Sequence, residues 1–266
     1  MTVLIETRAL ARNFGAVTAA ADINVSITAG EIVGVIGSNG AGKTTFINMV
    51  TGYLPPSSGE ILFKGKSILG KSPRKVMHSG ICRSFQVAQL FPELTVLDNV
   101  LIAYGMRNKG ILSMLTPLSN KQTIQQATEL LEEYGITEYI AETVITLPQG
   151  VRKLLDIAMA MVGKPEVLLL DEPTSGVAID DKFELMDTVM KAVRKSGAAV
   201  LFVEHDMEVI ARYSTRLMAF YDGRVLADGP TNQIMNDEKV QQLVTGHHLE
   251  INTDQNSNTN SEVTYA

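Results

Sequence analysis

The chain has 266 residues, of which 45% are hydrophobic and 20% charged, and its formal net charge at pH 7 is −6. This length and composition predict a folded protein with a substantial buried core and exclude a disordered chain. The negative charge disfavours a nucleic-acid binder, which usually needs a basic face, although a local basic patch is compatible with it. Cys82 is the one cysteine, which excludes an internal disulfide framework or a cysteine-rich metal site and fits a reducing compartment.

The sequence also predicts a chain that does not itself span a membrane. Residues 1–15 lack the continuous apolar stretch of a signal peptide. Apolar runs such as Val167–Leu170 and Ala198–Val203 are far shorter than the roughly 20 residues that cross a bilayer. Whether the protein docks on a membrane is a separate question.

The first part of the chain predicts short β-strands, several of them bounded by glycine, at Val3–Ile5, Ile23–Ile27, Ile32–Ile36 and Ile61–Phe63. From about Leu94 to Val162 the pattern favours helices. Within that stretch we expect a packing helix that ends near Gly135. Its apolar face is formed by Ile124, Ala127, Leu130 and Leu131.

From Pro165 onward the pattern predicts a β–α–β unit. The runs Val167–Leu170 and Ala198–Val203 are almost wholly apolar and end in charge, as central strands of a parallel sheet do. A helical segment, Asp180–Arg194, separates them.

A glycine-rich loop is the strongest chemical signal in the sequence. It follows the run Ile32–Ile36, precedes a helix-compatible segment that begins at Thr45, and matches the phosphate-binding pattern G-x-x-x-x-G-K-[ST]. Glycines let successive N–H groups face one anion, and the helix adds its positive end. We expect Lys43 to reach the β- and γ-phosphates and the Thr44 hydroxyl to ligate Mg²⁺. The loop consists of Gly37, Ser38, Asn39, Gly40, Ala41, Gly42, Lys43 and Thr44.

Two acids, Asp171 and Glu172, follow the apolar run that ends at Leu170, at the strand end where ligands of open α/β sheets bind. An acidic pair at a strand end is often a solvated terminus, but a phosphate-binding loop in the same chain favours a catalytic pair. We expect Asp171 to hold Mg²⁺ directly or through water. Glu172 is then placed to polarise the water that attacks the γ-phosphate.

Further residues are needed to choose a family, because GTPases, kinases, helicases and transporters share this loop. The guanine-reading pattern Asn-Lys-x-Asp of GTPases has its nearest match at residues 120–123, where the acid is missing. Phe14, Gln86 and His205, together with the string Asp171–Ser175, instead resemble the motifs of the ABC transporter ATPase family.

That resemblance implies a role for each of these residues. Phe14 would stack on adenine, the alternative being a core phenylalanine, and stacking contributes on the order of 1 kcal/mol. Gln86, with LFPELTVLDNV after it, would sense the γ-phosphate and Mg²⁺ and lead into a helical subdomain. His205 would contact the γ-phosphate, although a lone histidine is more often structural. The implied cofactors are ATP and Mg²⁺. The phosphate loop and Thr45 would hold ATP. The implied Mg²⁺ ligands are Thr44, Gln86 and Asp171. The implied catalytic residues are Lys43, Gln86, Glu172 and His205.

The resemblance runs from Val3 to about Gly246 and implies an α/β fold, a P-loop NTPase core with an antiparallel β portion and an inserted helical subdomain. We expect one domain over residues 1–246, with the helical subdomain at about 87–163. The remaining residues, 247–266, are rich in Asn, Thr and Ser, which predicts a weakly ordered tail.

Within the family, the chain looks closest to the ATPases that serve importers of branched-chain (hydrophobic) amino acids and of urea. This rests on the surroundings Arg83–Gln86, the phrase EHDM and the insert Tyr104–Ser119. The implied partners are a second ATPase subunit, transmembrane permease subunits and, indirectly, a solute-binding protein, at the cytoplasmic face of the inner membrane. The alternatives are the ATPase of an exporter, such as a lipopolysaccharide system, and a soluble ABC ATPase, whose usual coiled-coil insertions or tandem cassettes are missing here.

The sequence departs from the family at its LSGGQ signature, which would close over ATP bound to a partner cassette. The corresponding residues are Leu147, Pro148, Gln149, Gly150 and Val151, so Pro148 replaces the serine and removes a hydroxyl and an N–H. Proline suits a first helical turn, so we expect the helix to persist. Ala178 also stands where the family often has Asp or Asn.

We hypothesise that the chain binds its own ATP well and closes poorly over that of its neighbour, which would suit a heterodimer with a partner whose signature is intact. The alternative is that the family tolerates change at the serine position, and the second ATPase subunit could then be a different chain or a second copy of this one.

Overall fold

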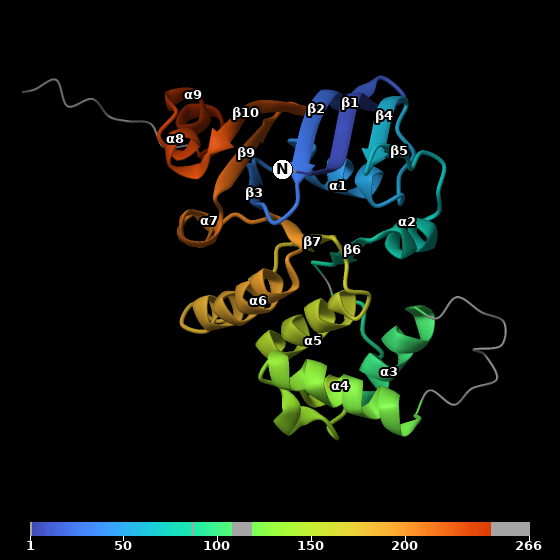
Figure 1. The fold of residues 1–266 in the computed structure, drawn as a ribbon. Coiled ribbons are helices and arrows are strands. Elements are labelled where there is room, and N and C mark those ends of the chain that lie inside the picture. The colour runs from blue at the N-terminus through green and yellow to red at the C-terminus, as the bar shows by residue number, and fades with distance from the viewer. Residues whose placement is uncertain (1, 87, 108–118, 246–266) are drawn as a thin grey trace, which may run out of the picture.

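The computed structural model describes residues 2–86, 88–107 and 119–245, and its strands form a four-stranded sheet, β2-β1-β4-β5, and a six-stranded sheet, β10-β9-β3-β8-β7-β6 (Figure 1). The strands are β1 (Val3–Phe14), β2 (Val17–Thr28), β3 (Ile32–Gly37), β4 (Ser58–Phe63), β5 (Lys66–Ser67), β6 (Ile81–Ser84), β7 (Val167–Asp171), β8 (Ala199–Val203), β9 (Arg216–Tyr221) and β10 (Arg224–Pro230). The helices are α1 (Lys43–Val50), α2 (Pro73–Ser79), α3 (Val96–Arg107), α4 (Lys121–Glu133), α5 (Gln149–Met161), α6 (Lys182–Ser196), α7 (Met207–Tyr213), α8 (Thr231–Met235) and α9 (Glu238–Val240).

The larger sheet is parallel from β6 to β9, and β10 adds an antiparallel edge. Every residue of β3, β7 and β8 is buried, because helices or the second sheet cover both faces of these strands. Both faces need apolar side chains, which explains the continuous apolar runs. The predicted β–α–β unit is confirmed as β7, α6 and β8.

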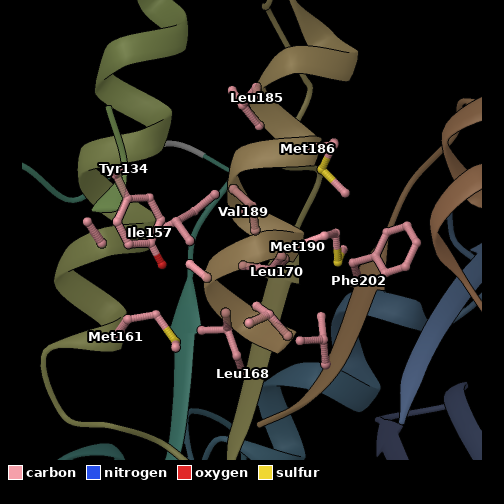
Figure 2. Packing of buried hydrophobic residues seen from close by; sticks show 14 of the residues in the cluster. Tyr134, Ile157, Met161, Leu168, Leu170, Leu185, Met186, Val189, Met190 and Phe202 are labelled. Atoms are coloured by element: carbon pink, nitrogen blue, oxygen red, sulfur yellow. The ribbon is translucent and has the colours of Figure 1, made fainter. Parts of the chain in front are cut away.

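The hydrophobic core has two parts, one on each face of the parallel sheet. Along β7, Leu168 and Leu170 join a core shared with α5 and α6, whereas Val167 and Leu169 join a core with α1 and the antiparallel sheet. Figure 2 shows the first of these, in which Leu168, Leu170 and Phe202 of the sheet meet apolar side chains of the helices.

The antiparallel sheet is longer than the sequence indicated, because β1 and β2 are 12-residue strands rather than short apolar segments. They pair as a hairpin from Val3 opposite Thr28 to Phe14 opposite Val17. Gly15, in the turn, has φ +59°. The outer half of β1 mixes polar with apolar residues, so its sequence gives no continuous apolar run.

Helices α3, α4 and α5 lie between β6 and β7 in the chain and gather at one end of the molecule (Figure 1). The packing helix predicted there is confirmed as α4, which the Asn120 side chain caps and which buries Ala127 and Leu131. Gly135 follows its end with φ +67°. The subdomain limits of about 87–163 and the single domain over 1–246 stay predictions. The tail, 247–266, and most of the insert Tyr104–Ser119 lie outside the described residues.

Helix α6 begins at Lys182, after the Asp180 expected from the sequence, because Ala178–Asp181 form a turn first. The carbonyl of Ala178 accepts hydrogen bonds from the N–H groups of Asp181 and Lys182 at 3.1 Å each. In the parts of the chain that the structure describes, no helix is long and apolar enough to cross a bilayer.

Candidate active site

Four adjacent parallel strands carry the predicted site residues at one edge of the sheet. The glycine-rich loop follows β3, His205 follows β8, Asp171 and Glu172 stand at the end of β7, and Gln86 follows β6. Because the carboxyl ends of parallel strands meet at one edge, segments far apart in the chain reach one place.

The glycine-rich loop runs from the end of β3 to α1, which begins at Lys43. Gly42 has φ +98°, and a Cβ there would lie 2.7 Å from the Ala19 carbonyl oxygen. At Gly37 a Cβ would meet the carbonyl oxygen of Phe220 at the same distance. Glycine is therefore required at both positions, for close approach and, at Gly42, for backbone conformation. Ser38, Asn39, Gly40 and Thr44 are exposed on this loop, and Thr45 is partly buried.

The Lys43 side chain folds back over the loop that precedes it. Its Nζ donates to the carbonyl oxygens of Gly37 at 2.6 Å and Ser38 at 3.1 Å. Burial lowers the pKa of Lys43, and the negative charges of Glu172 and Asp171 oppose that shift. The ammonium group thus lies at the loop, where a phosphate would benefit from a positive charge.

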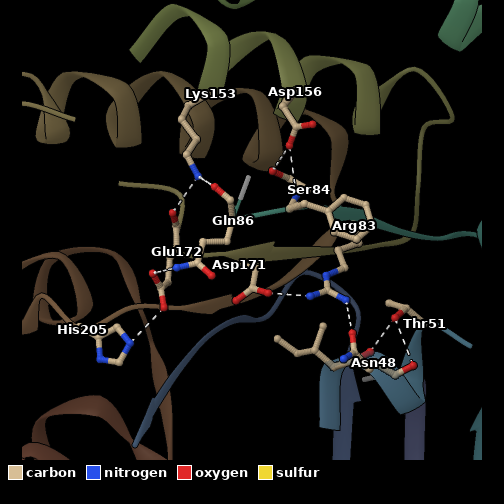
Figure 3. A network of polar contacts seen from close by, with 12 residues as sticks. Asn48, Thr51, Arg83, Ser84, Gln86, Lys153, Asp156, Asp171, Glu172 and His205 are labelled. Atoms are coloured by element: carbon tan, nitrogen blue, oxygen red, sulfur yellow. Dashed lines mark hydrogen bonds and ion pairs between the residues drawn. The ribbon is translucent and has the colours of Figure 1, made fainter. Parts of the chain in front are cut away.

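The Glu172 carboxylate contacts two other predicted catalytic side chains (Figure 3). Gln86 Nε2 donates to Glu172 Oε2 at 2.6 Å. His205 Nε2 lies 3.1 Å from Glu172 Oε1. An acceptor held between an amide and an imidazole is suited to orient a water molecule and take up its proton.

Asp171, beside Glu172, is held in a buried ion pair. Arg83 Nη2 lies 2.6 Å from Asp171 Oδ2, and the exposed fractions of the two side chains are 7% and 8%. Arg83 Nη1 also donates to Asn48 Oδ1 at 2.5 Å, which links the pair to α1. Arg83 therefore fixes the carboxylate and supplies part of its countercharge.

The residues expected to bind Mg²⁺ have the chemistry that this ion prefers. Asp171 offers a carboxylate, Thr44 a hydroxyl at the start of α1 and Gln86 an amide oxygen, all of them hard oxygen donors. Among the described residues, His, Cys, Asp and Glu form no cluster of three or more that could hold a metal ion. The donor set fits Mg²⁺, since Mg²⁺ bound with a nucleotide usually takes further ligands from phosphate oxygens and water.

Phe14, the predicted adenine-stacking residue, is the last residue of β1 and is 48% exposed. The alternative of a core phenylalanine is therefore wrong. The guanidinium carbon of Arg12 lies 4.6 Å from the centre of its ring. Ala19, in the same hairpin, approaches Gly42 of the phosphate loop, so the hairpin carrying Phe14 reaches the loop.

The degenerate signature lies at the start of α5. Leu147 is buried, Pro148 occupies the N-cap position without a side-chain capping bond, and the helix begins at Gln149. The helix persists as expected, although Pro148 precedes its first turn. A Cβ added to Gly176 would lie 3.5 Å from Gln149 Nε2, so the signature packs beside the segment that precedes Ala178.

Sequence reasoning missed several buried polar residues that hold the site together. Glu204 Oε1 accepts hydrogen bonds from the backbone N–H and the hydroxyl of Thr174, and its Oε2 accepts one from the N–H of His205. Lys153 and Asp156 of α5 contact the Gln86 segment. The available signal was a charged residue inside an otherwise apolar helix face or strand end.

Comparison with known proteins is consistent with this geometry. Residues 20–175 match the family model described as ABC transporter. The high-affinity branched-chain amino acid transport ATP-binding protein BraF of Pseudomonas aeruginosa is 32% identical, over 91% of this chain and 98% of that protein. LivG of Escherichia coli, which carries the same description, is 33% identical over the same shares. The solved ADP conformation of MJ1267, an ATP-binding cassette of an ABC transporter, superposes with a TM-score of 0.82 at 27% identity, covering 91% of this chain and 98% of that one. The chain is therefore a member of the ABC transporter ATP-binding family.

Proposed function

We propose that this chain is the ATP-hydrolysing subunit of an importer for branched-chain or other hydrophobic amino acids, urea or a similar small solute. Hydrolysis is inferred from the Glu172 carboxylate, which lies between Gln86 and His205. It stands at the same edge of the parallel sheet as the phosphate loop. The solute class rests on BraF and LivG, whose names give branched-chain amino acid transport. Those names do not favour an exporter or a soluble ABC ATPase.

In the proposed mechanism, N–H groups of residues 37–45 and the Lys43 ammonium bind the phosphates, while Phe14 stacks on adenine. Thr44, Gln86 and Asp171 would hold Mg²⁺, which neutralises charge on the phosphate oxygens when it is bound. A water held by Glu172 attacks the γ-phosphorus and passes a proton to the carboxylate as the bond to the β-phosphate oxygen breaks. Gln86 and His205 orient Glu172, and His205 would also contact the charge that develops on the γ-phosphate.

The implied assembly pairs this chain with a second cassette and with separate permease subunits at the cytoplasmic face of the inner membrane. ATP binding would close the cassettes, and loss of the γ-phosphate would let them reopen. Segment 87–163, the proposed helical subdomain, would pass this motion from Gln86 to the permease. A solute-binding protein would deliver the cargo indirectly.

Replacing the catalytic carboxylate tests this proposal. We expect Glu172→Gln to lower the ATP turnover of the full chain by about 10²- to 10⁴-fold, the usual contribution of a general base. ATP binding should persist, because the phosphate loop is unchanged. Lys43→Ala should weaken both binding and turnover. Phosphate release and binding of a fluorescent ATP analogue measure the two effects.

Glu184→Gln is the matched control, because Glu184 is exposed in the first turn of α6. It should leave turnover unchanged. Wild-type turnover in Glu172→Gln, or in Lys43→Ala, would contradict the proposed hydrolysis site. Purification of the chain with its natural partners would identify the permease and the second cassette.

A further inference from the structure

A buried lysine on α5 reaches both segments whose side chains meet in the active site. Lys153 is 1% exposed, and its Nζ donates to the backbone carbonyl oxygens of Gln86 at 2.5 Å and Glu172 at 3.1 Å (Figure 3). Gln86 and Glu172 also meet through their side chains. Gln86 and Glu172 are therefore linked twice: through their side chains, and through their backbone carbonyls by the Lys153 ammonium group.

A charged group at this position needs its hydrogen bonds, because burial of an ammonium group in an apolar setting is costly without them. Burial lowers the pKa of Lys153, and the negative charges of Asp156, Glu204, Glu172 and Asp171 oppose that shift. A long apolar side chain would fill the space without this cost. What the ammonium adds is a directed contact with two carbonyl groups.

The backbone of Glu172 has a conformation that needs support. Its φ is +48°, in the left-handed region that a residue with a Cβ seldom adopts. Such conformations persist where surrounding contacts fix them. The Glu172 N–H donates to the Val203 carbonyl at 3.0 Å, and its carbonyl accepts from Ser175 N–H at 3.1 Å as well as from Lys153. Lys153 thus contributes to holding the backbone that aims the carboxylate.

The same helix face also holds the segment around Gln86. Asp156, one turn after Lys153, accepts hydrogen bonds from the Ser84 hydroxyl at 2.6 Å and from the N–H groups of Phe85 and Gln89 at 3.1 Å each. Lys153 therefore donates to a backbone carbonyl of this segment, and Asp156 accepts from its backbone N–H groups. Helix α5 therefore serves as a rigid support for Gln86.

We propose that Lys153 is a positioning residue for ATP hydrolysis. Its ammonium group keeps the backbones of Gln86 and Glu172 in the relative position that brings their side chains together. This rests on the proposed function, in which Glu172 activates the attacking water. Lys153 acts through Glu172 and does not itself contact the reacting atoms.

Substitution of Lys153 in the full chain tests the proposal. A shift of about 1 Å in a reacting group can cost 10²-fold in rate, so we expect Lys153→Met to lower kcat by about 10- to 100-fold. KM and the affinity for an ATP analogue should change less than about threefold, because Lys153 does not contact the phosphate loop. Lys153→Arg, which keeps the positive donor, should recover part of the loss. Lys191→Met, at an exposed position of α6, is the control and should retain wild-type kcat.

A second measurement separates positioning from simple loss of folded protein. In the Glu172→Gln background, adding Lys153→Met should lower the residual single-turnover rate by a much smaller factor than in wild type, since Glu172, one of the two residues that Lys153 positions, no longer acts. An equal fold-loss in both backgrounds would overturn the proposal, and so would a parallel fall in kcat and ATP-analogue binding. If Lys153→Met does not fold, the same cycle is measured with Lys153→Arg, whose displaced donor should lower kcat by a larger factor when Glu172 is present than in the Glu172→Gln background.

Failure of this inference is distinguishable from failure of the proposed function. Wild-type kcat in Lys153→Met, together with a large loss in Glu172→Gln, would overturn only the role of Lys153. Equal turnover in wild type and Glu172→Gln would overturn the proposed function itself.

Discussion

Arg83 and Asp171 form an ion pair that is almost wholly excluded from solvent, at the end of β7 and next to Glu172. Removing one partner of such a pair leaves the other charge buried and uncompensated, which costs about 3–5 kcal/mol. We therefore expect Arg83→Met to lower the free energy of unfolding by about that amount. Urea titration followed by circular dichroism would measure the change.

A surface pair of the same chemistry provides the control. Arg212 and Asp187 lie 2.8 Å apart, but their side chains are 51% and 53% exposed. Exposed pairs contribute about 0–1 kcal/mol, so Arg212→Met should have a small effect on unfolding. Equal losses of stability in the two variants would show that burial does not determine how much the Arg83–Asp171 pair contributes to the free energy of unfolding.

At the scale of single residues, the sequence revealed the groups that belong to contiguous motifs. Lys43, Glu172 and His205 could be found because each follows an apolar strand in a recognisable string. Arg83 and Lys153 could not, because their partners lie far away in the chain: Arg83 and Asp171 are 88 positions apart, and Lys153 and Gln86 are 67 positions apart. Such contacts depend on strand order, which a single sequence does not specify.

At the scale of elements, helix α5 begins beside Pro148, which occupies the N-cap position without a side-chain hydrogen bond. In Pro148→Ser, a capping hydroxyl would stabilise the helix by about 1 kcal/mol. Loss of proline would also give the unfolded chain more conformational freedom, which lowers the free energy of unfolding by about 0.4–1 kcal/mol. We expect the two effects to offset each other, so the midpoint of urea unfolding should stay nearly constant.

Pro230→Ser is a matched variant, because Pro230 also occupies an N-cap position without a side-chain capping bond, at α8. It should be similarly close to neutral. A loss of more than about 2 kcal/mol in Pro148→Ser alone would mean that Pro148 stabilises α5 through contacts beyond its capping position.

Whole elements were predicted well where one physical cause dominates. Strands β7 and β8 are buried on both faces, so their sequences are uniformly apolar. Helix α4 has an apolar face, a capping Asn120 and a terminal Gly135, which agree with one another. Strand β1 extends to Phe14 through backbone pairing with β2, while its pairing with β4 ends at Ala11, and the sequence of its outer residues gives little sign of a strand.

At the scale of the whole molecule, two parts of the chain differ in how many of the expected ATP-contacting groups they contain: the edge of the parallel sheet and the start of α5. The edge of the parallel sheet brings together Gln86, Glu172 and His205 beside a complete phosphate loop. The start of α5, which by family resemblance would close over the ATP of a partner, has Pro148 in place of a hydroxyl donor. Helix α5 also carries Lys153, so the same helix contributes to both parts.

This difference predicts unequal ATP sites in an assembled pair of cassettes, if the signature of the partner is intact. A lost hydrogen bond to a charged group costs about 1.5–3 kcal/mol, which corresponds to about 10- to 150-fold in rate at the site closed by Pro148. In the purified complex, Glu172→Gln should therefore abolish most ATP turnover, whereas the equivalent change in the partner should remove little. Pro148→Ser should raise turnover at the weaker site, which becomes measurable when the Glu172→Gln change silences the stronger one. Equal losses from the two Glu→Gln changes would contradict the asymmetry and favour tolerance of proline in the signature.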